Sequence, residues 1–308
     1  MEFCVLIEPH HGAGYLDQLR VARCAEELGF AGFFRSDHLI AGDGDGLPGP
    51  TDTWVTLGGL SRETDSIRLG SLMTTATFRH PSVLAVTVAQ VDEMSGGRVE
   101  FGFGAGWWAR EHNATGIDLF EATERFDRFE EQLEIIDGLW KTPVGSSYSH
   151  AGAHFTLVDS PALPKPVQAH IPVIIGGDGK KRTPAISARW ADEFNSGWDD
   201  PVKTAATFTR VKKACQAIGR DPQTLRLSTV QTLCAGASEA DLVRRAEAIG
   251  STHEELGGAL VGDGDRLREQ IAAFADVGVE RIYVEIIDLA DLDQLEFFAT
   301  EVFQLRGR

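Results

Sequence analysis

The chain is poor in cysteine, and the four cysteines that it has are far apart. Cys4, Cys24, Cys215 and Cys234 form no CxxC pair in a sequence of 308 residues. This spacing predicts free thiols in a reducing compartment rather than a disulfide framework or a zinc site. A chain of this length can bury roughly 75% of the surface that its unfolded form exposes, so it does not need disulfide bonds to stabilise its fold.

Long hydrophobic runs and basic clusters are also missing. No apolar stretch approaches the roughly 18 residues that a membrane-spanning helix requires, and no basic segment precedes the first apolar run, which ends at Glu8-Pro9. Lys and Arg number 29 against 46 Asp and Glu, and the net charge is −17. Phosphate contacts need clustered basic side chains. These absences predict a soluble, cytoplasmic protein that binds neither nucleic acid nor an anionic membrane.

What is present is a repeated alternation of a short apolar strand and an amphipathic helix. One helix is predicted from Thr51-Asp52, residues suited to capping, to Thr64, and a long one from about Glu121 to Trp140. The predicted strands cover residues 3–7, 32–36, 67–72, 98–103, 172–175, 193–195, 225–230 and 281–287. Eight such units without a linker predict one α/β domain over residues 1–308, a (β/α)8 TIM barrel. A doubly wound sheet is the alternative architecture.

One segment, at about 141–170, interrupts the alternation. It is rich in Gly, Ser and Pro and contains a short stretch of strand-forming residues around 148–157. We therefore expect an excursion from the barrel before the fifth strand, with a small hairpin inside it.

Charged residues on the predicted strands indicate a polar cluster inside the barrel. Val99, Phe101 and Phe103 share one face of their strand, and Glu100 lies on the other. If the apolar face meets the helices, Glu100 points inward, and the same argument turns charged residues of three other strands inward. Since an unpaired buried charge is costly, we expect ion pairing within this group. Its members are Arg68, Glu100, Arg226 and Glu285.

The carboxyl ends of barrel strands are where binding groups gather, so the residues after each strand are site candidates. Asp37 and His38 follow the second strand, and an imidazole can exchange a proton near neutral pH. A threonine-rich loop at 74–77 follows the third strand and offers hydroxyl groups to a flat heterocycle. The plainer interpretations are that the polar residues at 36–38 only cap the next loop, and that the threonine-rich segment is a loop leading into a helix whose first turn favours Pro81.

Glycines follow the fourth and fifth strands. Residues 102–106 read Gly-Phe-Gly-Ala-Gly, which lets a ligand approach the backbone, and Trp107 and Trp108 come directly afterwards. This is not GxGxxG, so it predicts no dinucleotide fold. The segment 176–179, Gly-Gly-Asp-Gly, precedes three basic residues and a helix, as in a phosphate cradle. Core packing of the tryptophans and a simple glycine turn are the alternatives.

No metal is expected. Asp43-Gly44-Asp45-Gly46 lacks the remaining ligands of a calcium loop, and His253-Glu254-Glu255 is not HExxH. His10-His11 has no Cys or carboxylate nearby at metal-ligand spacing.

Together these segments resemble the luciferase-like monooxygenase superfamily, and specifically its F420-dependent oxidoreductase branch. The resemblance covers nearly the whole chain, and its motifs, modest one by one, are specific as a collinear set. They are the segments 25–30 (AEELGF), 36–39 (SDHL), 67–70 (IRLG), 77–81 (TFRHP), 95–98 (SGGR), 104–107 (GAGW), 124–128 (ERFDR), 164–168 (PKPVQ) and 174–177 (IIGG).

The resemblance implies that coenzyme F420, a deazaflavin, lies across the barrel mouth. Asp37 would contact its ring system, and His38 would lie near the reactive carbon as a proton donor or charge stabiliser. Leu72 and Met73 match a bulge at which relatives carry a non-prolyl cis peptide that supports the ring. Further cofactor contacts are implied for Thr75, Ala105 and Gly106, and for Gly176, Gly177, Asp178 and Gly179, which match the region that holds the phosphate-bearing tail.

The chain departs from this resemblance at Trp107. Sugar-phosphate dehydrogenases of the branch place a catalytic Glu there, and the nearest carboxylate in this chain is Glu111, one helical turn further on. The departure argues against a sugar-phosphate substrate. It favours an apolar or aromatic pocket for a small organic molecule, lined by Trp107, Trp108 and Trp198.

Three functions remain open. The leading hypothesis is hydride transfer between F420 and a small organic substrate, with His38 handling a proton. An FMN-dependent monooxygenase of the same fold, served by a partner reductase, is the second, and a non-catalytic cofactor-binding barrel is the third. The resemblance also implies a homodimer, whose expected contact is Trp54, Leu57, Leu60, Val83 and Val86.

Overall fold

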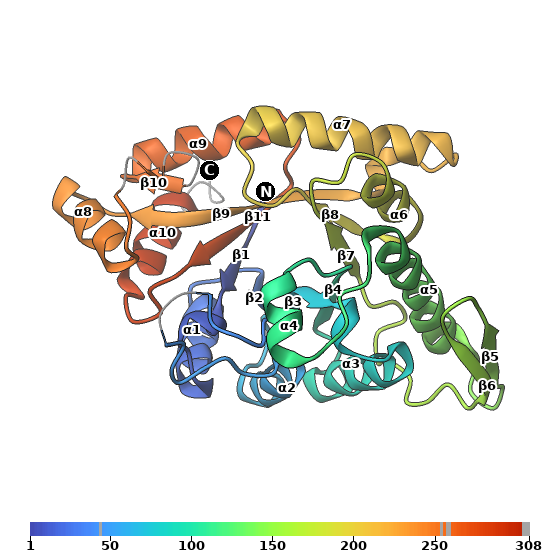
Figure 1. The fold of residues 1–308 in the computed structure, drawn as a ribbon. Coiled ribbons are helices and arrows are strands. Elements are labelled where there is room, and N and C mark those ends of the chain that lie inside the picture. Colours follow the sequence, from blue (N-terminus) through green and yellow to red (C-terminus); the bar gives the residue numbers. More distant parts are fainter. Residues whose placement is uncertain (43–44, 253–254, 257–259, 304–308) are drawn as a thin grey trace.

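Eight parallel strands form a closed ring in the computed structural model, which describes residues 1–42, 45–252, 255–256 and 260–303 (Figure 1). They are β1 (Glu2–Ile7), β2 (Gly32–Arg35), β3 (Arg68–Thr75), β4 (Val99–Gly104), β7 (Val173–Gly176), β8 (Glu193–Asn195), β9 (Arg226–Ala235) and β11 (Arg281–Ile286). Each strand pairs with the next in this order, and β11 pairs with β1. The predicted (β/α)8 barrel is confirmed.

Helices surround the ring in Figure 1. They are α1 (Tyr15–Glu27), α2 (Thr53–Glu63), α3 (Pro81–Ser95), α4 (Ala109–Thr115), α5 (Ala122–Lys141), α6 (Arg182–Trp190), α7 (Pro201–Ala217), α8 (Glu239–Ala248), α9 (Gly264–Asp276) and α10 (Asp293–Phe303). The predicted start of α2 is confirmed, because the Asp52 carboxylate accepts the backbone N–H groups of Trp54 and Val55 at 2.9 Å. No described helix combines the length and apolarity needed to cross a membrane.

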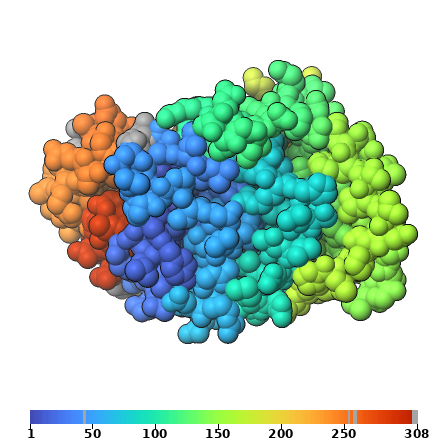
Figure 2. Space-filling model, turned by 60° about the horizontal axis from the view of Figure 1, so that its bottom comes forward, coloured from blue at the N-terminus to red at the C-terminus, as the bar shows by residue number. Residues whose placement is uncertain are grey.

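A hairpin projects from the barrel between α5 and β7. Its strands are β5 (Tyr148–Ala151) and β6 (Thr156–Ser160), which pair antiparallel where a hairpin is expected. Figure 2 shows this yellow-green segment at the edge of the molecule opposite the orange α8 region. The short α4 and a further strand, β10 (Leu260–Gly262), which pairs with the end of β9, are not predicted from the sequence.

The two faces of β4 divide as predicted. Phe101 and Phe103 pack outward against α5, with ring centroids 5.7 Å from Trp140 and 5.1 Å from Phe129. Glu100 is buried inside the barrel, where it forms an ion pair with Arg68.

The interior ion cluster is centred on Arg281, which the sequence interpretation does not single out. Arg281 Nη1 lies 2.6 Å from Glu100 Oε2 and 2.9 Å from Glu193 Oε2, and all three side chains are buried. Tyr283 donates its hydroxyl to Glu193 at 2.6 Å. Arg226 reaches this cluster only at its edge, 3.7 Å from Glu193.

The predicted participation of Glu285 in this ion cluster is wrong. Glu285 is four residues beyond Arg281 on β11, which places it about 13 Å further along the strand. Its carboxylate lies at the other end of the barrel interior, where it accepts hydrogen bonds from Trp198 and Thr232.

Candidate active site

A cavity of about 530 Å³ opens at the carboxyl ends of the strands. It brings together twelve of the predicted site residues: His38, Leu72, Met73, Thr75, Ala105, Gly106, Trp107, Gly176, Gly177, Asp178, Gly179 and Trp198. Its wall also contains residues that sequence reasoning misses, among them Glu8, Ser36, Arg125, Phe126, Thr183 and Asn195. Asp37 and Trp108 are not part of the wall.

One wall of the cavity is an irregularity in β3. The peptide bond between Leu72 and Met73 is cis, and the pairing of β3 with β4 shifts register between Ser71 and Thr74. The bulge and the cis peptide implied by the resemblance are thus confirmed. Met73 extends toward β7, because a Cβ built on Gly176 would overlap the Met73 methyl group and lie 2.6 Å from the Asn195 carbonyl oxygen.

His38 lies on the cavity wall with a carboxylate behind it. Glu111, buried on α4, places Oε2 3.2 Å from His38 Nδ1 and also accepts the backbone N–H of Leu39. Burial disfavours the imidazolium, but the hydrogen bond and the negative charges of Glu111, Glu8 and Asp37 outweigh it, so the pKa of His38 is raised. Since Nδ1 faces Glu111, Nε2 is the nitrogen left for other partners.

Asp37 has a different position from the one expected. Its side chain is 2% exposed, and its two oxygens pair with Arg79 at 2.5 and 3.1 Å. Oδ2 also accepts the backbone N–H of Thr75 at 3.1 Å. The carboxylate therefore links the end of β2 to the end of β3 beneath the cavity, and this bonding leaves it turned away from a ligand.

The three tryptophans divide into two groups. Trp107 is 70% exposed at the rim, and Trp198 lies across the cavity with its indole N–H bonded to Glu285 at 2.9 Å. Trp108 is behind the wall, where its ring packs edge-on against His38 at 5.3 Å. Trp107 and Trp198 are thus the two that a substrate could contact, and Trp108 supports His38.

The glycine turn after β7 leads into α6. The backbone N–H of Gly177 is bonded to the Asn195 carbonyl at 3.1 Å, and Thr183 in the first turn of α6 lines the cavity. Arg182 points away to Asp127 at 2.6 Å, so it does not complete a phosphate cradle as its sequence position suggests. Arg125 lies at the cavity instead, and its buried Nε has no hydrogen-bond partner.

The Glu285 carboxyl, which accepts a hydrogen bond from Trp198 of the cavity wall, makes the stability of the fold depend on pH. Burial, with the negative charge of Glu8, raises the pKa of Glu285 to about 7 against the hydrogen bonds from Thr232 and Trp198. A carboxyl whose pKa is higher in the folded than in the unfolded chain contributes stability below its unfolded pKa and loses it as pH rises through the folded value. We expect unfolding titrations to show the protein losing stability relative to Glu285→Gln between pH 4.5 and about 7. Parallel pH profiles of the two proteins would contradict this.

Several sequence interpretations of surfaces and metal sites need revision. Trp54, Leu57 and Leu60 are buried between α2 and the barrel, so the predicted dimer contact is wrong for them; Val83 and Val86 are exposed. Homodimerisation itself stays a prediction.

The prediction that no carboxylate lies near His10-His11 is also wrong, because Glu8 Oε2 lies 3.1 Å from His10 Nδ1. Asp43-Gly44 and His253-Glu254 fall outside the described residues.

The closed ring of strands and the cavity at the strand ends make this a (β/α)8-barrel protein with a candidate site at the usual place for such barrels. Comparisons with known proteins give its family. Residues 1–257 match the luciferase-like monooxygenase family, and the chain belongs to it. Over 199 residues it is 33% identical to an F420-dependent glucose-6-phosphate dehydrogenase of Microbacterium testaceum, covering 64% of this chain and 57% of that one. Over 190 residues it is 31% identical to the pyrimidine monooxygenase RutA of Escherichia coli, covering 57% and 48%. The chain therefore spans only about half the length of these relatives.

Solved structures share the fold over its full length. An F420-dependent secondary alcohol dehydrogenase in complex with an F420-acetone adduct superposes with a TM-score of 0.85 at 17% identity, covering 99% of both chains. The monooxygenase RslO1 from Streptomyces bottropensis superposes with a TM-score of 0.83 at 20% identity, covering 99% of this chain and 100% of that one. At these identities the likeness concerns the fold alone.

Proposed function

We propose that this protein is an F420-dependent oxidoreductase that transfers a hydride between the deazaflavin and a small organic substrate. The observation that carries the proposal is the cavity at the strand ends, which has His38, held by Glu111, on its wall. Two relatives more than 30% identical are named F420-dependent glucose-6-phosphate dehydrogenases, and this supports F420 over FMN.

The residues of the cavity fit a flat, anionic cofactor. Gly106 has φ +80°, and a Cβ there would lie 3.0 Å from both Thr75 and Thr77, so the backbone itself forms this part of the wall. Ser36 Oγ and Arg125 Nε are buried without hydrogen-bond partners and so are available to a polar ligand. The first turn of α6 presents backbone N–H groups, which favour negative charge.

Different residues of the chain would then hold the ring, hold the anionic tail and exchange the proton. Met73, Ala105 and Gly106 would hold the ring, and Gly176–Gly179 with Arg125 would hold the anionic tail. When bound, F420 supplies a two-electron hydride donor or acceptor. His38 would give a proton to, or take one from, the substrate at Nε2, because Glu111 occupies Nδ1.

Asp37 and the tryptophans would act on position and specificity. We assign Asp37 to positioning Thr75 through its backbone N–H, in place of the ring contact that the resemblance implies. Trp107 and Trp198 would form an aromatic pocket for the substrate. Because Trp107 stands where the sugar-phosphate enzymes carry a Glu, the proposed substrate is apolar rather than a sugar phosphate.

Cofactor choice is tested by titrating the purified protein with F420 and with FMN. We expect F420 to quench its fluorescence with a dissociation constant at least about tenfold lower than that of FMN, which is about 1.4 kcal/mol of preference. Gly106→Ala should weaken F420 binding, whereas Gly219→Ala should not. Both glycines have positive φ, +80° and +75°, so the backbone strain is matched, but a Cβ at Gly219 meets nothing within 4 Å. Tighter binding of FMN would favour the flavin-dependent monooxygenase instead.

A further inference from the structure

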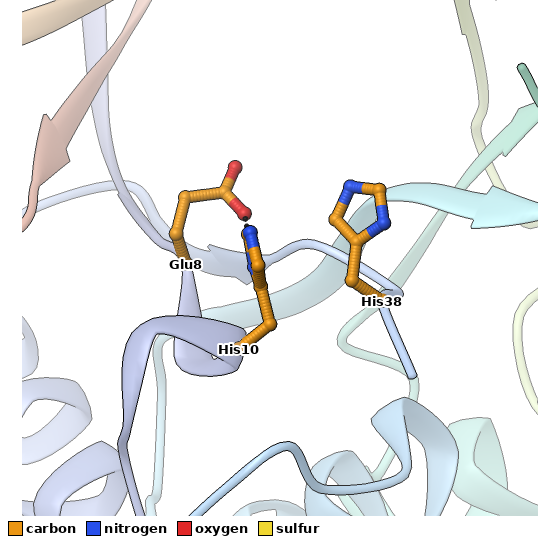
Figure 3. A group of neighbouring side chains, drawn as sticks. All are labelled: Glu8, His10 and His38. Atoms are coloured by element: carbon orange, nitrogen blue, oxygen red, sulfur yellow. Dashed lines mark ion pairs between the residues drawn. The ribbon is translucent and has the colours of Figure 1, made fainter. Parts of the chain in front are cut away.

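Glu8, His10 and His38 bring three metal-ligating side chains together at one side of the barrel mouth. One ligand atom from each lies within 4.8 Å of the others. Figure 3 shows the Glu8 carboxylate and the His10 ring pointing at each other, with the His38 ring facing them across a gap. Glu8 and His10 follow β1, whereas His38 follows β2, so the closure of the barrel assembles the group.

Two of these side chains are incompletely satisfied. Glu8 Oε2 and His10 Nδ1 form an ion pair at 3.1 Å, but both atoms are buried and neither has a hydrogen-bond partner. A tetrahedral ion with bonds of about 2.0–2.2 Å separates its ligand atoms by about 3.3–3.6 Å. The observed spacing is therefore close to that of two ligands of one ion, and small rotations of the side chains would reach it.

His38 is prepared for the same role by Glu111. The carboxylate lies 3.2 Å from Nδ1, so Nε2 is the ring nitrogen left for another partner. A carboxylate behind the second ring nitrogen is the usual arrangement for a metal-ligating histidine, because it fixes the tautomer and the ring orientation. Glu111 is itself held by the backbone N–H of Leu39.

We propose that Glu8, His10 and Nε2 of His38 bind one divalent transition-metal ion of the zinc class. Two imidazoles and one carboxylate suit zinc, cobalt or nickel, whereas magnesium and calcium prefer oxygen ligands alone. Glu8 and His38 line the cavity, which gives the ion a path of entry and leaves a fourth position open to water. Metal binding at this site does not depend on hydride transfer. Because His38 Nε2 cannot exchange a proton while it is bonded to the ion, a bound ion would inhibit the oxidoreductase activity proposed above.

The test is a titration of chelator-treated, tag-free protein with Co²⁺, followed by the visible absorption of the coordinated ion. We expect one Co²⁺ per chain, displaced by Zn²⁺ and unaffected by Mg²⁺. His10→Asn and Glu8→Gln should each weaken binding at least about tenfold, and Glu111→Gln about 10- to 100-fold. His170→Asn is the matched control, because His170 pairs with Asp192 at 2.7 Å on the surface and takes no part in the cluster.

Circular dichroism and the unfolding midpoint would verify that each variant is folded. Absence of stoichiometric Co²⁺ binding to the unaltered protein would overturn the proposal, and so would equal losses in His10→Asn and His170→Asn. If His10→Asn does not fold, Glu8→Gln decides the question, since unchanged Co²⁺ affinity in that variant contradicts a ligand role for Glu8.

Discussion

Replacing His38 by alanine is expected to lower kcat by about 10²- to 10⁴-fold, the usual range for loss of a positioned acid or base. The side chain is oriented from behind by Glu111, and His38 is the only histidine among the described residues that line the cavity. F420 affinity should change little, because the ring and tail contacts proposed above come from other strands. The measurement is F420 reduction with a panel of small alcohols, and oxidation of reduced F420 with the matching carbonyl compounds.

The control for His38→Ala is His170→Ala, whose side chain is exposed and remote from the cavity. The assays include a chelator, so that a metal ion bound at His38 does not lower the measured kcat. Glu111→Gln should lower kcat by about 10- to 100-fold without raising KM for F420, because it disturbs the orientation of His38 rather than a ligand contact. An unchanged kcat in His38→Ala would contradict the assignment of His38, whereas F420 binding without turnover in the unaltered protein would support the non-catalytic barrel.

Much of the fold is predictable because the strand signal is local. An apolar run followed by an amphipathic helix, repeated eight times, predicts a closed parallel sheet, and the three-residue strand at Glu193–Asn195 is identified this way. The rule that sites form at strand ends then brings His38, the β3 bulge and the Gly176 turn to one cavity. Glu8 follows β1 directly, so the same rule could have found it.

The remaining features depend on tertiary contacts that no local pattern encodes. Arg125 lies in the first turn of an ordinary amphipathic helix, and only the packing of α5 against the barrel brings its guanidinium to the cavity. The pairing of Glu111 with His38 joins residues 73 positions apart. Strand parity turns Arg281 and Glu285 to the same face, but it does not say that they meet different partners at opposite ends of the barrel.

The buried cluster inside the barrel leads to the largest expected change in stability. Arg281→Met should reduce the free energy of unfolding by about 3–5 kcal/mol, the usual cost of removing one partner from a buried ion pair. Arg281 is 2% exposed and neutralises both Glu100 and Glu193, and burial already raises the pKa of Glu193. Without the guanidinium, two carboxylates face each other in a region of low polarity.

Urea unfolding measures the effect, and Arg226→Met is its matched control. The Arg226 side chain is 38% exposed and lies 3.3 Å from Glu2 and 3.7 Å from Glu193, so its loss should cost no more than about 1 kcal/mol. The deficit of Arg281→Met should shrink as pH falls, because carboxyl groups with raised folded-state pKa values stabilise the fold when protonated. Adding Glu193→Gln should recover part of the loss for the same reason. Equal destabilisation by the two arginine variants would show that the interior cluster does not depend on Arg281.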